Sequence, residues 1–116
     1  MVNINIASAV VIEIAEREYR KSIEIADYYL AYQNLAGLLL KMGKKEEAES
    51  FLAYSLEKFP RNSGFYFMLA AIRYQRGEIE NAIALLEQSL KNDPQNTQAQ
   101  GLYWMIRTGQ KVNFED

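Results

Sequence analysis

The sequence predicts an all-α protein in which about six helices stack as antiparallel pairs. The first reason is an internal repeat, because residues 31–62 shifted by 34 positions onto 65–96 give 11 identities in 32 aligned pairs without a gap. The second is spacing, since apolar residues in each copy recur at i, i+3, i+4 and i+7, which places them on one face of a helix. The third is the presence of glycine or proline between these runs, because both residues commonly mark the end of a helix. Each copy therefore contains two helices.

Composition limits the classes of function. The 116 residues are 49% apolar, which suits one domain with its own core. A net charge of −2 argues against nucleic-acid binding, and the lack of cysteine and histidine removes thiol and imidazole chemistry and the usual zinc ligands. The sequence contains no apolar run long enough to cross a membrane and no signal peptide. We therefore expect a non-enzymatic cytoplasmic protein without cofactor or metal.

The N-terminal segment, residues 1–28, is expected to contain one capping helix over about 8–26. Ala15 and Tyr19 occur at the offsets that the repeat uses in its second helix, so this helix has no first helix before it. Asp27 is the expected N-cap of the helix that follows.

The first repeat, 29–62, is expected to form helices over 28–42 and 45–58. Gly43 follows the first of these helices, where a left-handed residue ends a helix without steric cost. Pro60 follows the second helix and blocks its continuation, because proline has no backbone N–H to donate.

The second repeat, 63–96, carries the same pattern. Helices are expected over 63–76 and 79–92, with Gly77 after the first and Pro94 after the second. In both repeats, we expect an alanine at the contact between the two helices of the pair, and these alanines are Ala48 and Ala82.

The C-terminal helix, 97–108, is expected to cap the stack, followed by a tail over 109–116. Asn62 and Asn96 precede predicted helices and are expected N-caps. Trp104 occupies the place where both repeats have alanine, so it holds off a further helix. We expect its indole to be partly exposed or covered by the tail.

Charged residues are expected to form solvated helix faces. Paired carboxylates such as Glu46 and Glu47 are the remaining catalytic candidates, but charged residues normally line the outward side of a helix. Glu16 and Arg20 are four residues apart and should form an ion pair.

The repeat resembles the tetratricopeptide repeat family over residues 29–96. The resemblance rests on an aromatic residue, a Leu-Ala pair, Gly, Ala, Leu and Pro at fixed offsets, which are Tyr32, Leu35, Ala36, Gly43, Ala48, Leu52 and Pro60 in the first unit and Tyr66, Leu69, Ala70, Gly77, Ala82, Leu86 and Pro94 in the second. The resemblance implies a right-handed α-solenoid whose concave side, lined by first helices, binds protein partners.

Carried over position by position, the family's concave side gives a predicted partner-binding site. Its residues are Leu30, Gln33, Gly37, Leu40, Lys41, Phe67, Ala71, Tyr74, Gln75 and Met105. The middle of this site is apolar, which favours an apolar or amphipathic helical segment of a partner protein. The positions with which family members hold a terminal carboxylate do not match, so that mode is rejected. Alternatively, these residues belong to the core, or the N-terminal residues Val2, Ile4 and Ile6 cover them.

Several functions remain open. The leading hypothesis is an adaptor or chaperone, and in size, charge and groove polarity the chain is similar to bacterial type III secretion chaperones. A second hypothesis is self-assembly into dimers or filaments through Trp104 and the Val10–Ile12 run, so monomer and homodimer both remain possible. The run 93–99 is also similar to part of the mitochondrial fission adaptor, an organelle-membrane adaptor whose membrane anchor this chain lacks.

Overall fold

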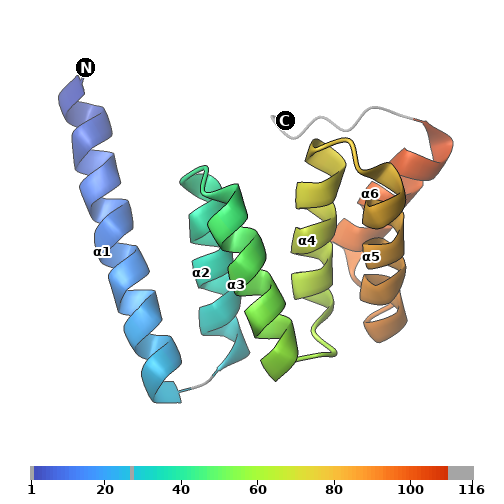
Figure 1. Ribbon diagram of the computed structural model, residues 1–116, viewed down its shortest axis with the longest axis horizontal. Helices are drawn as coiled ribbons and strands as arrows, with labels where there is room; N and C mark the ends of the chain where they lie inside the picture. The colour runs from blue at the N-terminus through green and yellow to red at the C-terminus, as the bar shows by residue number, and fades with distance from the viewer. Residues whose placement is uncertain (1, 27, 110–116) are drawn as a thin grey trace. The chain divides into compact units, whose positions relative to one another are not determined.

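A computed structural model describes residues 2–26 and 28–109, with the backbone alone for 2–8 and 22–26. Within these ranges it contains α-helices and no strands, which confirms the all-α prediction (Figure 1). The helices are α1 (Val2–Ala26), α2 (Tyr29–Lys41), α3 (Lys45–Lys58), α4 (Ser63–Gln75), α5 (Ile79–Asn92) and α6 (Thr97–Thr108).

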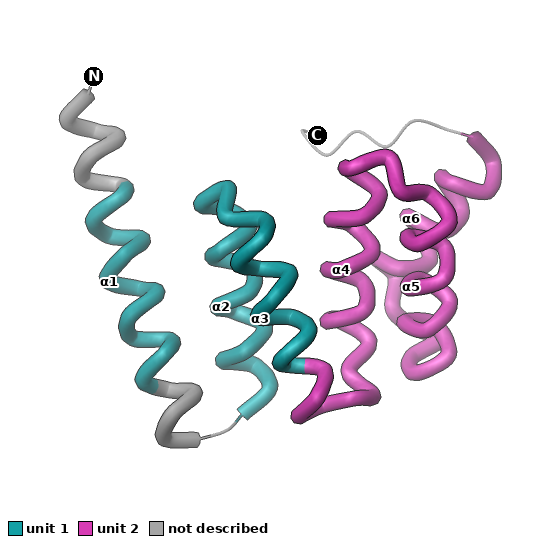
Figure 2. The backbone as a smooth tube through the Cα atoms, in the orientation of Figure 1, with its two compact units in different colours: residues 1–55 teal, residues 56–116 magenta. Residues whose placement is uncertain are grey.

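The chain divides into two compact units, residues 1–55 and 56–116 (Figure 2). The first unit contains α1, α2 and most of α3, and the second contains the end of α3 with α4, α5 and α6. Each unit is described separately below.

Glycines end the first helix of each repeat, as predicted. Gly43 and Gly77 have φ values of 75° and 82°, in the left-handed region that side chains disfavour. After Gly43 the amide of Lys44 donates to the carbonyl oxygen of Leu39 at 2.9 Å, which satisfies an orphan carbonyl of the last turn of α2.

The predicted asparagine caps are confirmed in the second unit. Asn62 Oδ1 accepts a hydrogen bond from the amide of Phe65 at 3.0 Å, and Asn96 Oδ1 accepts one from Ala99 at 3.1 Å. Each bond satisfies one of the free amides at a helix start, worth about 1 kcal/mol. Asp27 lies outside the described residues; the N-cap of α2 is Tyr28, which makes no side-chain cap hydrogen bond.

The first helix is longer than predicted, because α1 begins at Val2 rather than near residue 8. Residues 2–8 include β-branched valine and isoleucine, which lower helix propensity only slightly, and neither glycine nor proline interrupts them. The side chains of Val2, Ile4 and Ile6, a predicted cover for the binding site, lie outside the described part of the chain.

The core of the first unit lies between α2 and α3. Its members are each at most 1% exposed and are Tyr32, Leu35, Ala36, Leu39, Ala48 and Leu52. Tyr32 stacks on Phe51, with ring centroids 5.6 Å apart and planes inclined by 14°. Tyr32 thus joins α2 to α3 as the repeat pattern requires.

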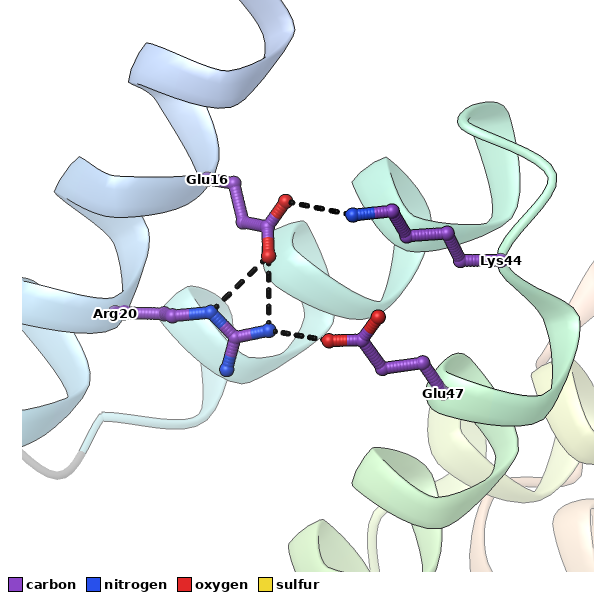
Figure 3. Close-up of polar contacts among 4 residues, drawn as sticks. All are labelled: Glu16, Arg20, Lys44 and Glu47. Atoms are coloured by element: carbon purple, nitrogen blue, oxygen red, sulfur yellow. Dashed lines mark hydrogen bonds and ion pairs between the residues drawn. The ribbon is translucent and has the colours of Figure 1, made fainter.

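Four charged side chains connect α1 to the start of α3 (Figure 3). Arg20 Nη2 lies 2.9 Å from Glu16 Oε1 on the same helix and 2.9 Å from Glu47 Oε1 on α3. Lys44 Nζ lies 3.6 Å from the other oxygen of Glu16. The predicted Glu16–Arg20 pair is therefore confirmed, and it belongs to a larger cluster that bridges the two helices.

The second unit packs α4, α5 and α6 against one another. A buried cluster joins the three helices and consists of Ala70, Leu86, Ala99 and Leu102. In the part of the chain that the structure describes, no helix is long and apolar enough to span a membrane.

A buried polar network fastens α4 to α5 and α6. The hydroxyl oxygens of Ser63 and Ser89 lie 2.7 Å apart, and each also lies within hydrogen-bond distance of the other residue's carbonyl oxygen. Asn96 Nδ2 donates to Ser63 Oγ at 2.9 Å, so the N-cap of α6 belongs to the same network. Buried hydroxyls are stable here because they are satisfied.

Candidate partner-binding face

One stripe of α4 carries the aromatic part of the predicted site. Phe67, Ala71 and Tyr74 recur at i, i+4 and i+7, so they lie along one side of the helix. All three are partly buried and pack against the cluster of Ala70, Leu86, Ala99 and Leu102. Each residue therefore supports the core with one side and leaves the other side accessible. We call Phe67, Ala71 and Tyr74 the α4 stripe.

Two further residues lie on α6, which packs against α4 in the second unit. Gln98 is exposed and Met105 is half-buried, and they lie two turns apart on the same side of α6. Gln75, at the end of α4, is exposed. The α4 stripe, Gln75 and Met105, half of the predicted site residues, therefore all belong to the second unit, and only the three residues of the α4 stripe pack against one common cluster.

The face is uncharged. Within their bounds α4 and α6 each contain a single charged residue, Arg73 and Arg107. Arg73 Nη1 lies 2.9 Å from Glu78 Oε1. Arg107 lies 3.9 Å from Glu87 of α5 and donates from Nε to the hydroxyl of Tyr103 at 3.2 Å. Both guanidinium groups are therefore engaged with side chains outside the α4 stripe.

The ion pair at Arg73 changes the acidity of its partner. The hydrogen bond from Arg73 is the largest cause that lowers the pKa of Glu78 below its ordinary value of 4.5, and the amide of Asn81 contributes a further hydrogen bond. Glu78 is thus held as an anion that neutralises Arg73.

The remaining half of the predicted site lies on α2 in the first unit. Leu30 is 41% exposed, Gln33, Gly37 and Leu40 are half-buried, and Lys41 is exposed. Among the described residues, no atom lies within 4 Å of the place where a Cβ of Gly37 would stand. This face mixes apolar residues with an amide and a cation, unlike the α4 stripe.

Two features of the molecule are absent from the sequence predictions. The network of Ser63, Ser89 and Asn96 joins three helices. Its signal in the sequence is a serine at the first position of a repeat together with a serine in the last turn of the second helix of that repeat. The extension of the Glu16–Arg20 pair to Glu47 has no local signal, because 27 residues separate Arg20 from Glu47. Among the described residues, no group of three or more acidic side chains is placed to hold a metal ion.

Comparison with known proteins agrees with the helical repeat. The sequence profile described as "Tetratricopeptide repeat" matches residues 39–104, more than half of the chain. The chain therefore belongs to the tetratricopeptide repeat family.

Individual relatives are distant. The chain is 26% identical over 78 residues, 67% of its length, to the rRNA biogenesis protein rrp5 of Schizosaccharomyces pombe, and it spans 5% of that protein. Among solved structures, it is similar to the first repeat domain of Spaghetti (RPAP3) bound to the HSP90 peptide SRMEEVD. That similarity has a TM-score of 0.72 at 19% identity and covers 88% of this chain and 82% of the other, which shows a shared fold.

Proposed function

We propose that the protein is a non-enzymatic interaction module that binds an apolar or amphipathic helical segment of a partner protein. The observation that carries this proposal is the α4 stripe, whose residues are partly buried on one side and accessible on the other. Family membership supports a protein or peptide as the ligand, and Spaghetti, a structural neighbour, binds a peptide of HSP90.

The chemistry of the face argues for an apolar ligand. The peptide held by the neighbour is acidic at its end, with Glu, Glu and Asp among its last four residues. A ligand of that kind needs cations opposite its carboxylates, whereas Arg73 and Arg107 already pair with glutamates. Aromatic and apolar side chains gain free energy by burying apolar surface instead, about 1.5–3 kcal/mol for each side chain fully buried.

Helical segments suit the spacing of the face. The α4 stripe presents side chains along two turns of one helix, and an amphipathic helix offers anchors at the same spacing, i, i+3 or i+4 and i+7. Adaptors and chaperones, including chaperones that shield a helical tail before secretion, both use such a surface. A chaperone differs in one measurable way, because it keeps its partner soluble when the two are produced together.

Selection from a random library of 16-residue peptides on the immobilised chain tests the proposal. We expect enrichment of peptides with apolar residues at helical spacing, and loss of this enrichment when the target carries Tyr74→Glu. Enrichment of peptides that end in acidic residues would contradict the assignment of an apolar ligand. If the same peptides were enriched equally on the parent chain and on the Tyr74→Glu chain, the α4 stripe would not be the binding face.

A further inference from the structure

The outer side of α6 presents a tryptophan at the surface. Trp104 is 63% exposed, although aromatic side chains of this size usually contribute to cores or interfaces. It lies opposite Ala99 and Leu102, the residues with which α6 packs into the second unit. Trp104 belongs to a row at i, i+4, i+7 and i+11, the spacing of a helix–helix seam, and the row consists of Thr97, Gly101, Trp104 and Thr108. We call this row the α6 seam.

The repeat itself shows which neighbour the α6 seam does not accept. The residues equivalent to Trp104 in the two repeats are Ala36 and Ala70, both 0% exposed. Ala70 lies in the cluster that joins α4 to Leu86 of α5, where an alanine lets the two helices approach closely. An indole at this position prevents that approach, so a helix can pack on α6 only if it offers a hole for the ring.

Gly101 provides such a hole on the α6 seam itself. Among the described residues, no atom lies within 4 Å of the place where a Cβ of Gly101 would stand. The glycine lies three residues before Trp104, and the α6 seam contains no charged residue. Arg107, the cation of α6, lies one turn after Trp104 at the border of the α6 seam, where it contacts Tyr103 and Glu87.

We propose that the α6 seam is a homodimer interface in which two copies of α6 pack antiparallel. In this arrangement Trp104 of each chain lies over Gly101 of the other, and Thr97 faces Thr108 of the other chain. A two-fold interface requires a surface that is complementary to itself, and a protruding ring beside a hole on one uncharged row meets that requirement. The α6 seam shares no residue with the α4 stripe, although Gly101 lies one turn from Gln98 and from Met105 on α6, and the proposal does not rest on the proposed function.

The area available predicts a weak dimer. A tryptophan buries about 150–250 Å² when fully covered, so two indoles and the short rows beside them remain below the roughly 1,000 Å² typical of stable interfaces. We therefore expect a dissociation constant on the order of 10–100 μM.

Sedimentation equilibrium of the full chain between about 5 and 500 μM covers this range of affinity. We expect reversible dimers, and we expect Trp104→Ala and Gly101→Leu each to raise the dissociation constant by about tenfold or more. Gly101→Leu also replaces a helical glycine with a better helix former, so the melting temperature should not fall, which separates lost association from lost folding.

The double variant Gly101→Leu with Trp104→Ala tests the pairing. Because position 101 faces position 104 of the other chain, the double variant restores a large residue opposite a small one, and we expect it to regain part of the association that both single variants lose. Double variants that remain monomeric while melting normally would overturn the pairing.

Disulfide trapping tests the orientation, because the sequence contains no cysteine. An equimolar mixture of Thr97→Cys and Thr108→Cys chains should form the mixed disulfide, and neither chain alone should cross-link comparably. A disulfide formed mainly by Thr97→Cys alone would contradict the antiparallel arrangement. A chain that stays monomeric at the highest concentration, with an indole shielded from iodide, would show that the residues after Gly109 cover Trp104 and would overturn the proposal.

Discussion

The repeats 29–62 and 63–96 share the buried alanines of their helix pairs but differ along the first helix of each pair. Ala48 and Ala82, 34 residues apart, are both 0% exposed. In contrast, the position that carries Phe67 in the second repeat carries Gln33 in the first. Packing against the neighbouring helix restricts the core positions to a narrow range of shapes, whereas the outward positions can vary with the ligand. The shared alanines therefore report the fold, and we expect the differing residues of the α4 stripe to give the two repeats different binding properties.

A serine at one repeat position shows that identical residues can have different partners. Ser89 shares a network with Ser63, whereas Ser55 donates to the carbonyl oxygen of Phe51 in its own helix at 2.7 Å. The difference arises because Tyr29 stands in the first repeat where Ser63 stands in the second. A tyrosine at that position cannot give the short hydroxyl contact that two serines give.

Enlarging the shared alanines should produce the largest loss of stability. We expect Ala82→Leu to lower the free energy of unfolding by about 1–3 kcal/mol, because it overpacks the contact between α4 and α5. Ala48→Leu should cost a similar amount if the two repeats are equivalent in their cores. Urea unfolding monitored by circular dichroism measures both values. An Ala82→Leu variant as stable as the parent would mean that the repeat register is wrong.

The two serines should differ in their contributions to stability. Ser89→Ala removes the hydroxyl that contacts both the hydroxyl and the carbonyl oxygen of Ser63 in a buried site, and it should cost about 1 kcal/mol. Ser55→Ala removes one bond within a helix and should cost about 0.5 kcal/mol or less. The comparison uses the same unfolding experiment. If both variants lost the same free energy of unfolding, the buried network would add no stability to the second repeat.

Substitution of the glycine at the end of the first helix should lower stability by the same amount in both repeats. Gly43→Val and Gly77→Val should each cost about 1 kcal/mol or more, because a β-branched residue is strained at positive φ. Gly37→Ala is the matched control, since Gly37 lies inside α2 with open space beside it and alanine stabilises a helix by about 0.5–1 kcal/mol relative to glycine. Thermal melting compares the three variants, and a Gly77→Val variant that melts above the parent would contradict the assignment.

The smallest predicted effect is the loss of stability at acid pH through the ion pair of Glu78 with Arg73. Because the pKa of Glu78 is lowered in the folded protein, its ion pair with Arg73 adds stability above pH 4.5, and this increment is lost as pH falls through the lowered value. Glu78→Gln should therefore be slightly less stable than the parent at pH 7, and the difference should shrink towards pH 3. Both groups are accessible to solvent, so salt should weaken the difference as well. A difference that grows on acidification would contradict this pairing.

Features of the fold that depend on local geometry could be predicted from the sequence. Gly77 after a helix, Asn96 before one and Ala82 at a pair contact follow from repeat spacing, because each position has one dominant physical requirement. The ion pair of Arg20 with Glu47 could not be predicted, since it depends on how α1 packs beside α3. The early start of α1 lies outside the repeat pattern, because the offsets shared with the second helices begin only at Ala15 and mark no helix start before it.

The candidate site was predictable only as a set of positions. Helical spacing places Phe67, Ala71 and Tyr74 along one side of α4, and the structure confirms that they share a face. Their division between core and surface could not be predicted, because it depends on the cluster that α5 and α6 complete. Binding by these residues, and by Leu30 to Lys41 on α2, stays a prediction.

The most direct test is to place the same charge at the equivalent position of each repeat and measure affinity for one peptide selected on the parent chain. Phe67→Glu should weaken binding by about thirty-fold or more, since it removes an aromatic anchor and places a carboxylate in an apolar contact. Gln33→Glu should change affinity by less than about threefold. Melting temperatures are measured alongside, and Tyr74→Ala supplies a second anchor variant if Phe67→Glu fails to fold. The account would be contradicted if Gln33→Glu lost affinity for the peptide while Phe67→Glu remained folded and still bound it.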